Sequence, residues 1–340
     1  ASGTPCLRGK NISVATGSRV KSLPHLPIDR TRILTSDEAL LRRKLPQSIL
    51  IVGGGAIGVE FAYVYSTYGV QVTIAEMMPT LLPMEDHEVS ALLVRSFKKR
   101  GIAVKTGKHV QSIKDDAGVF SIDLGDETGA VESLSAEVVL VAVGRAPNVE
   151  NIGLESTGVM LEEKRRLIQV DEKMQTHQRG IYAIGDVTTR AALAHGAMAQ
   201  GVFVAESIAS IERTPIVLQA VPSAVYCQPQ IASIGLTEAA ARKAGLKIKV
   251  AKFPFSANGK AIALGETEGF VKIVADEKHG QILGAHLIGP EATELIGEFA
   301  LALTLEATAA ELKMSIHPHP TLSEAVMEAG GAIFNEGIHF

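Results

Sequence analysis

A chain of 340 residues with 46% hydrophobic residues is long enough for two or three domains and too apolar to be disordered. Its formal net charge of −4 argues against a nucleic-acid-binding stripe, and no apolar run approaches the roughly 20 residues of a membrane span. Its two cysteines, Cys6 and Cys227, lie far apart and outside any C-x-x-C or metal-ligand cluster. We therefore expect unpaired thiols, no metal site and a soluble protein of a reducing, intracellular compartment.

The first 40 residues predict little regular structure. Residues Ile12 to Ser18 form an apolar, strand-like run that ends in a glycine turn, with no predicted element before it. A proline-containing connector follows, and then a short mixed segment from Asp37 to Leu41. The initial run thus has the pattern of a strand that lacks its sequence neighbours.

From Ser48 onward, strands and helices alternate. Apolar runs and helical periodicity predict three strands with two helices between them, at residues 49–52, 56–68, 70–76, 86–100 and 102–105. The first strand is apolar at consecutive positions, as expected when both faces of a sheet are buried. This order of elements is typical of a right-handed parallel sheet, and the expected fold class is α/β.

The rest of the chain predicts two other kinds of structure. Short alternating strands broken by glycines fill residues 110–143, and a strand at 181–184 precedes a long helix at 194–211. After Val221 the pattern changes to that of an antiparallel α+β domain. Its strands are expected near Ala224, Ile231, Lys247, Val271 and Ile282, and its helices from about Ala292 and Leu322.

A G-x-G-x-x-G motif is formed by Gly53-Gly54-Gly55-Ala56-Ile57-Gly58, directly after an apolar strand and at the start of a helix. In this context Gly53 permits a tight turn, Gly55 lets the backbone approach a pyrophosphate, and Gly58 lets the helix pack closely on the strand. The helix N-terminus supplies free N–H groups and partial positive charge to the phosphates. The motif therefore predicts a dinucleotide site.

An acidic residue, Glu76, ends the second predicted strand, 18 residues after Gly58. A carboxylate at this point accepts hydrogen bonds from the adenosine ribose and repels a 2′-phosphate. Methionines rather than an arginine follow it directly. NAD is therefore favoured over NADP, and the alternative is a glycine turn with a solvated glutamate that binds no nucleotide.

Two further stretches carry candidate functional side chains. The strand at 181–184 ends in Gly185-Asp186, and a carboxylate in this place faces the ligand crevice of an open α/β sheet, unless it only caps a helix. Residues 317–324 read His-Pro-His-Pro-Thr-Leu-Ser-Glu. A histidine beside a carboxylate is a general base suited to neutral pH, and a following proline restrains it, with a cis peptide as an option. The alternative is a surface loop with fortuitous histidines.

These stretches occur together with Ala-Val-Gly-Arg-Ala-Pro-Asn at 142–148 and with Ala192-Leu193-Ala194-His195. The combination resembles the flavin-dependent pyridine nucleotide-disulfide oxidoreductases over essentially the whole chain. Within that family it is most similar to the members that reoxidise dihydrolipoamide in 2-oxoacid dehydrogenase complexes. The resemblance implies Rossmann-like FAD and NAD domains and a C-terminal α+β dimerisation domain.

Roles for particular residues follow from the resemblance. His319 would be the catalytic base and Glu324 would orient it, with His317 nearer to structural support. The NAD contacts would be Gly53, Gly55, Gly58, Glu60, Glu76 and Gly144. The FAD contacts would be Thr16, Gly17, Ser18, Asp186, Leu193, Ala194 and His195. The domains would be an FAD-domain remnant at 1–40, an NAD domain at 41–147, a second FAD or central segment at 148–218 and an interface domain at 219–340.

The implied activity is the oxidation of protein-bound dihydrolipoamide to lipoamide, with electrons passing through a disulfide and FAD to NAD⁺. The implied partners are a second copy of the chain, the lipoylated acyltransferase core and its small binding domain. Neither nucleic acid nor a membrane is expected as a partner. The implied location is the cytoplasm or, in a eukaryote, the mitochondrial matrix.

The resemblance also implies two features that the 340 residues do not contain. One is a first glycine loop for the FAD diphosphate, and the other is a C-x-x-x-x-C pair that exchanges with lipoamide. Cys6 and Cys227 cannot replace that pair, which needs a fixed spacing on one helix. We therefore expect an enzyme that lacks its N-terminal third, through an incomplete gene reading or truncation, and that does not turn over dihydrolipoamide alone.

Two alternatives stay open at this point. A glutathione- or mercuric-type reductase is disfavoured by Glu76, because NADP-using members place basic residues near the ribose, and residues 335–340 lack the terminal cysteine pair of mercuric enzymes. A non-catalytic NAD-binding dimerisation module is less attractive, because a scaffold needs no tuned base at His319.

Overall fold

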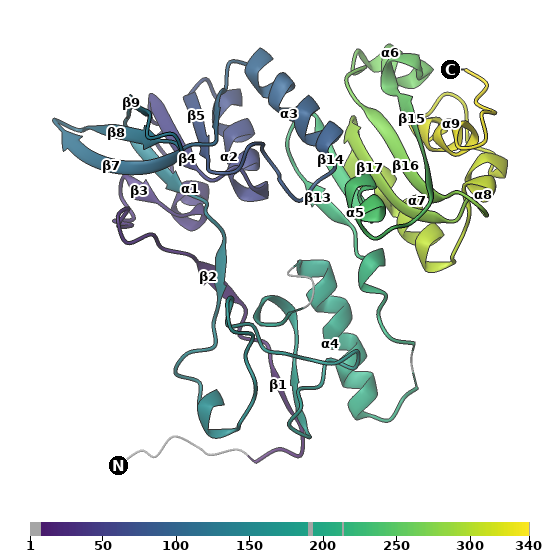
Figure 1. Cartoon of the computed structure of the whole chain (residues 1–340). Helices are drawn as coiled ribbons and strands as arrows, with labels where there is room; N and C mark the ends of the chain where they lie inside the picture. The colour runs from purple at the N-terminus through teal and green to yellow at the C-terminus, as the bar shows by residue number, and fades with distance from the viewer. Residues whose placement is uncertain (1–7, 190–192, 213, 340) are drawn as a thin grey trace. The chain divides into compact units, whose positions relative to one another are not determined.

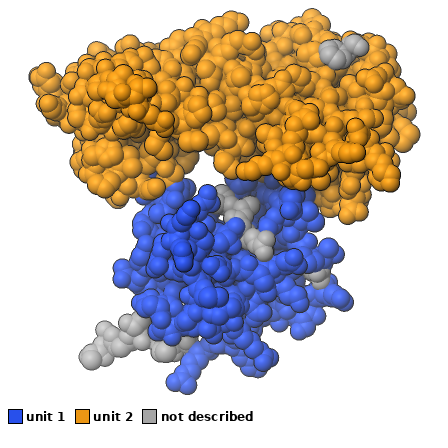
Figure 2. Space-filling view, in the orientation of Figure 1, with its two compact units in different colours: residues 1–20, 145–221 blue, residues 21–144, 222–340 orange. Residues whose placement is uncertain are grey.

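The computed structural model describes residues 8–189, 193–212 and 214–339 (Figure 1). The chain divides into two compact units, the first built from residues 1–20 and 145–221 and the second from residues 21–144 and 222–340 (Figure 2). Each unit therefore combines two stretches that are distant in the sequence. The four-segment domain division expected from the sequence stays a prediction.

The first half of unit 2 is built on a five-stranded parallel sheet in the order β3-β10-β4-β5-β6. Its strands are β3 (Ile33–Leu34), β4 (Ser48–Val52), β5 (Gln71–Glu76), β6 (Ala103–Thr106) and β10 (Val138–Val141). The helices that accompany them are α1 (Ser36–Leu41), α2 (Ala56–Thr67) and α3 (His87–Lys99). The expected alternation of strands and helices is confirmed, and the mixed segment at 37–41 is a helix.

Strand β4 shows why its sequence is apolar at consecutive positions. Ile49 and Ile51 pack in a core with α2 and α3, whereas Leu50 and Val52 pack in a second core with the antiparallel sheet of β7 (His109–Asp116), β8 (Val119–Gly125) and β9 (Val131–Ala136). Because side chains alternate along a strand, both faces of the sheet are covered.

Helix α3 forms where its pattern predicts it. Asp86 caps its first turn by accepting a hydrogen bond from the Glu88 N–H, and Lys98 and Lys99 lie in its last turn. Val89 and Phe97 are fully buried on one face. The acidic start of this helix contacts the C-terminal half of the unit, as described below.

The second half of unit 2 is a five-stranded antiparallel sheet in the order β13-β14-β17-β16-β15. Its strands are β13 (Ser223–Val225), β14 (Gln230–Gly235), β15 (Ile248–Pro254), β16 (Phe270–Asp276) and β17 (Ile282–Gly289). Its helices are α5 (Glu238–Lys243), α6 (Gly259–Leu264), α7 (Ala292–Thr304), α8 (Ala309–Met314) and α9 (Glu324–Ala332). The expected antiparallel α+β domain is confirmed, with α5, α6 and α8 added to the two predicted helices.

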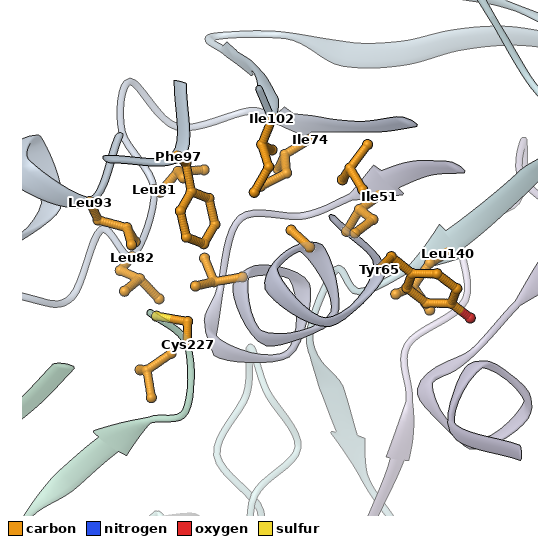
Figure 3. Close-up of a cluster of buried hydrophobic side chains, with 14 of the residues drawn as sticks. Ile51, Tyr65, Ile74, Leu81, Leu82, Leu93, Phe97, Ile102, Leu140 and Cys227 are labelled. Atoms are coloured by element: carbon orange, nitrogen blue, oxygen red, sulfur yellow. The ribbon is translucent and has the colours of Figure 1, made fainter. Parts of the chain in front are cut away.

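The two faces of this antiparallel sheet have different neighbours. Residues of α7, α8 and α9 share one hydrophobic core with one face. From the other face, Ile231 and Ile288 join the core of the parallel-sheet half. Cys227 belongs to the same core, and Figure 3 shows it beside Leu82. The two halves of unit 2 therefore share a continuous apolar core.

Unit 1 is smaller and has two two-stranded sheets. Strand β1 (Ile12–Val14) pairs in parallel with β12 (Ile181–Ala183), and β2 (Ser18–Val20) pairs antiparallel with β11 (Arg145–Pro147). Helix α4 (Ala194–Ile208) ends three residues earlier than expected. Short 3₁₀ turns lie at η1 (Leu154–Ser156), η2 (Gly185–Val187) and η3 (Leu218–Ala220) in unit 1, and at η4 (Phe255–Ala257) in unit 2. Among all described residues, no helix is both long and apolar enough to cross a membrane.

Candidate functional site

The glycine loop is shaped by close backbone contacts. Gly53 has φ +112°, and a Cβ there would lie 2.3 Å from the carbonyl oxygen of Ala142, which directly follows β10. A Cβ at Gly58 would lie 1.9 Å from the carbonyl oxygen of Gly53. A Cβ at Gly55, by contrast, would meet nothing within 4 Å. Two glycines therefore allow the turn and the helix packing, and the third leaves open space beside the backbone.

The N-terminus of α2 begins in that open space. Gly55 is its N-cap residue and makes no side-chain hydrogen bond to the first turn. The first N–H groups of the helix are therefore not capped by a side chain, and they add to the positive end of the helix dipole. Such an arrangement binds phosphate groups.

Glu76 lies beside the loop at the end of β5 and is 9% exposed. Its Oε2 accepts a hydrogen bond from the Gly54 N–H at 2.5 Å, and its Oε1 accepts one from the Met78 N–H at 2.6 Å. Each oxygen uses one lone pair in this way, so each keeps one for a ligand hydroxyl. The carboxylate is thus fixed against the loop with acceptor capacity remaining.

The other two candidate NAD contacts lie apart from the loop itself. Glu60, on α2, accepts a hydrogen bond from the Tyr226 N–H at 2.9 Å and so connects the two halves of unit 2. Gly144 has φ +103° and open space around its Cβ position, and its carbonyl accepts the Lys21 N–H at 3.0 Å. Neither residue has a role in shaping the glycine turn.

The histidine segment lies between α8 and α9. The Nδ1 atom of His319 is 2.9 Å from Oε1 of Glu324, the first residue of α9, and Oε2 of the same carboxylate accepts the Thr321 N–H at 2.8 Å. Burial would raise the pKa of Glu324, but the bonds from Thr321 and His319 outweigh it and hold that pKa below its ordinary value. The His319 ring is 78% exposed, and the peptide bond to Pro320 is cis.

Two more imidazole–carboxylate pairs accompany this one. His317 is 2.9 Å from Oε1 of Glu298 on α7, with its ring only 8% exposed. His339 is 2.7 Å from Oε1 of Glu328, whose other oxygen accepts the Ile338 N–H at 2.9 Å. Sequence reasoning missed the Glu328 pair, although Glu328 lies four residues after Glu324, on the same face of a helix.

The candidate flavin contacts in unit 1 form a polar cluster. Ser18 donates to Oδ2 of Asp186 at 2.5 Å and accepts from Nε of Arg145 at 2.6 Å. Thr16 donates to the carbonyl oxygen of Asn148 at 2.6 Å. Gly17 lies between them with φ +67° and open space at its Cβ position. The structure thus brings Ser18 and Asp186 together although 168 positions separate them.

The start of α4 provides the remaining candidates. Leu193 is its N-cap residue without a side-chain hydrogen bond to the first turn, and Ala194 and His195 begin the helix. Gln200, further along the helix, accepts the Gly185 N–H at 2.7 Å, and its buried Nε2 has no hydrogen-bond partner among the described residues. Ala192, which belongs to the same motif, lies outside the described residues.

The structure does not gather all candidates of unit 2 into one pocket. The glycine loop belongs to the parallel-sheet half, whereas α9 packs on the far face of the antiparallel sheet.

The described residues contain no cluster of metal-ligating side chains. Cys227 is buried, and burial, with a smaller effect of Glu60, raises the pKa of its thiol to about 12. Cys6 lies outside the described residues.

Comparisons with known proteins agree with this arrangement. The pyridine nucleotide-disulphide oxidoreductase family matches residues 6–201, and its dimerisation domain matches residues 221–330. The chain belongs to the pyridine nucleotide-disulphide oxidoreductase family. It is 46% identical to the dihydrolipoyl dehydrogenase of Mycobacterium leprae over 331 residues, which cover 97% of this chain and 70% of that protein. For the dihydrolipoyl dehydrogenase of Bacillus subtilis, the identity is 45% over 334 residues, with the same coverage.

Solved structures of the family have the same fold. LpdA of Mycobacterium tuberculosis superimposes with a TM-score of 0.87 at 29% identity, covering 94% of this chain and 69% of that one. The HOCl-induced flavoprotein disulfide reductase RclA of Escherichia coli gives a TM-score of 0.85 at 26% identity, covering 96% and 74%. Rossmann-like nucleotide domains with a C-terminal dimerisation domain are thereby confirmed as the fold.

Proposed function

We propose that the chain acts in a dihydrolipoyl dehydrogenase, in which it provides the NAD site, part of the FAD site, the catalytic base and the dimer surface. The single observation that carries the proposal is the His319–Glu324 pair, which lies on the dimerisation domain of a chain that is 45% and 46% identical to dihydrolipoyl dehydrogenases. The four-segment domain division and the cytoplasmic location are part of the same proposal.

His319 is the proposed base for the dithiol. With Nδ1–H donated to Glu324, the ring presents the lone pair of Nε2 to solvent, where a dihydrolipoamide thiol can reach it. Removal of the thiol proton creates the thiolate, which is the form that attacks a disulfide. The carboxylate of Glu324 stabilises the imidazolium that results.

The glycine loop is the proposed NAD site. The uncapped first turn of α2 holds the pyrophosphate, and the open space beside Gly55 lets the phosphates come close. Glu76 accepts the ribose hydroxyls and repels a 2′-phosphate. Glu60 and Gly144, which lie apart from the loop, are the remaining proposed contacts to NAD.

The residues of unit 1 fit the flavin in chemical type. The carboxylate of Asp186 suits the ribityl hydroxyls, and the open Gly17 turn beside Thr16 and Ser18 leaves room for a ligand. The unpartnered Nε2 of Gln200 and the uncapped N-terminus of α4 are donors, and Leu193, Ala194 and His195 line that helix start. When bound, FAD supplies the two-electron step between a dithiol and NAD⁺.

The dimerisation domain supports a homodimer as the partner arrangement. Large apolar side chains are exposed on α7, around α8 and at the C-terminal end, namely Leu301, Leu305, Met314, Ile316 and Ile338. Exposed apolar side chains that form one contiguous patch mark interaction sites, and we propose that these five residues lie at the dimer surface. Docking of the lipoylated acyltransferase core and its small binding domain on the dimer is the further part of the proposal.

The test of the nucleotide site is calorimetric titration of the chain with NADH and with NADPH. We expect NADH to bind about 100-fold more tightly, because Glu76 meets the 2′-phosphate of NADPH with like charge. Glu76→Gln should reduce that discrimination and serves as the matched variant. Equal affinities, or tighter NADPH binding by the unchanged chain, would favour a glutathione-reductase type of enzyme instead.

A second test concerns the dithiol itself. Burial raises the pKa of the Cys227 thiol and leaves it almost entirely protonated, and the 340 residues contain no C-x-x-x-x-C pair. We therefore expect no NADH formation from dihydrolipoamide and NAD⁺ with the FAD-supplemented chain alone. Absorbance at the NADH maximum follows the reaction. Sustained, His319-dependent turnover would refute the claim that a separate cysteine pair is needed.

A further inference from the structure

A basic row crosses the antiparallel sheet on the face that meets the NAD-binding half. Lys252, Lys272 and His286 are direct cross-strand neighbours on β15, β16 and β17. The Lys272 side chain is fully buried, and His286 is 1% exposed. A buried lysine in an apolar strand requires partners, since an isolated charge is costly to bury.

Those partners come mainly from the acidic start of α3. Lys272 Nζ lies 3.0 and 2.9 Å from the two oxygens of Asp86, and 2.8 Å from Oε2 of Glu88. Glu238, on α5, contributes a third carboxylate at 2.9 Å. Burial would lower the pKa of Lys272, but these three acids outweigh it and raise that pKa. The lysine is therefore held as a cation between the two halves of unit 2.

The segment between Glu76 and Asp86 connects this ion cluster to the nucleotide loop. Leu82, in its middle, has φ +46°, and its N–H donates to the Gly54 carbonyl at 2.8 Å. A Cβ at Gly54 would lie 2.6 Å from the Leu81 side chain, so the segment packs directly against the loop. A left-handed leucine is strained, and such strain persists only where contacts on both sides fix it.

Both ends of the segment are thus held by carboxylates with different tasks. At one end Glu76 accepts the N–H groups of Gly54 and Met78. At the other end Asp86 caps α3 and forms an ion pair with Lys272. Between them, Ser90 of α3 donates to the carbonyl of Leu82 at 3.1 Å.

We propose that Lys272 is a positioning residue for the dinucleotide site: it anchors the 77–86 segment through Asp86 and so fixes Glu76 and Gly54 for the adenosine ribose. This inference rests on the proposed NAD site. It adds that the site needs a residue of the dimerisation domain to hold Glu76 and Gly54 in place. The NAD-binding half then binds NADH with full selectivity only when that domain is docked on it.

The matched control is Lys252, which is the cross-strand neighbour of Lys272 and bonds Glu88 but not Asp86. Replacing either lysine by methionine removes the same charge from the same face of the sheet. Lys272→Arg keeps the charge and serves as the conservative rescue. Because Lys272→Met alone leaves Asp86 buried without a partner and can fail to fold, a second variant combines it with Asp86→Ser, which retains a helix cap.

The experiment measures the dissociation constants of NADH and NADPH by calorimetry, and the urea midpoint, for the full chain and each variant. We expect the double variant Asp86→Ser, Lys272→Met to fold. Its ratio of NADPH to NADH dissociation constants should be about tenfold lower than that of the unchanged chain. Lys252→Met and Lys272→Arg should keep the discrimination of the unchanged chain. A loss of fold alone would lower both affinities equally, so the ratio separates positioning from stability.

Unchanged discrimination in the folded double variant would overturn this inference and leave the proposed function standing. An equal loss of discrimination in Lys252→Met would also overturn it, because the effect would then belong to the general charge of the sheet. If the unchanged chain bound no NADH, the proposed NAD site would fail, and this inference would fail with it.

Discussion

The glycine loop and the His317–Glu324 segment lie in the same unit but are held in place by different means. The loop depends on backbone surfaces that approach so closely that a single added carbon would collide at Gly53 or Gly58. The histidine segment depends on side-chain carboxylates that accept N–H groups from rings and backbone. Added volume should therefore damage the first site, and a changed charge the second.

The largest effect is expected from added volume at the loop. In Gly58→Ala the new Cβ would lie 1.9 Å from the Gly53 carbonyl oxygen, so α2 must move away from β4. We expect a loss of about 3 kcal/mol in the free energy of unfolding and ~100-fold weaker NADH binding. Urea unfolding and calorimetry measure the two effects.

Gly55→Ala is the control for that prediction, because its Cβ meets open space. Its stability should change by no more than about 1 kcal/mol, while NADH binding weakens because the methyl group occupies the approach of the pyrophosphate. Equal losses of stability in the two variants would contradict the distinction between packing and ligand approach.

Changed charge in the histidine segment, and at Glu328 of the helix that follows it, should have a smaller effect on stability. Glu328→Gln removes the buried carboxylate that accepts from Ile338 and His339, and we expect the free energy of unfolding to fall by about 2 kcal/mol. Glu324→Gln, at a more exposed carboxylate, should cost about 1 kcal/mol. A larger cost for Glu324 than for Glu328 would reverse the order that burial predicts.

The acidic start of α3 predicts that the stability of the folded chain depends on pH. Burial would raise the pKa of Glu88, but its bonds to Lys252 and Lys272 lower that pKa to about 2, below its ordinary value of 4.5. The group binds protons more weakly in the folded chain, so its stabilisation is complete above pH 4.5 and is lost as the pH falls toward 2. The stability difference between the unchanged chain and Glu88→Gln should shrink over that window, as urea midpoints can show.

The smallest effect concerns Cys227, in the core that joins the two halves of the unit. A thiol whose pKa is raised to about 12 by burial has almost no thiolate at pH 8. In a Cys6→Ser variant we expect no reaction with dithiobisnitrobenzoate until urea unfolds the chain. Rapid labelling under native conditions would show that this core opens readily.

The glycine loop could be predicted from sequence because all of its parts are local. Gly53 and Gly55 lie in the turn between β4 and α2, Gly58 is the third residue of α2, and Glu76 ends the next strand. The spacing alone therefore carries the geometry. The same holds for His319 and Glu324, which are five positions apart.

Contacts between distant residues could not be predicted in this way. Ser18 and Asp186 meet only because β1 pairs with β12, and Lys272 meets Asp86 only because two sheets with different topologies dock together. Lys272 did leave a signal, since it interrupts the apolar run Phe-Val-Lys-Ile-Val, where a buried charge needs a partner. The identity of that partner requires the fold.

The most direct test of the catalytic proposal is the tautomer of His319, read from the ¹⁵N shifts of its ring by nuclear magnetic resonance at a pH where the ring is neutral. Because Glu324 accepts a hydrogen bond from Nδ1, we predict a proton on Nδ1 and a free lone pair on Nε2, and a mixture of tautomers in Glu324→Gln. A ring protonated on Nε2 in the unchanged chain would contradict the account, since no lone pair would then face the dithiol.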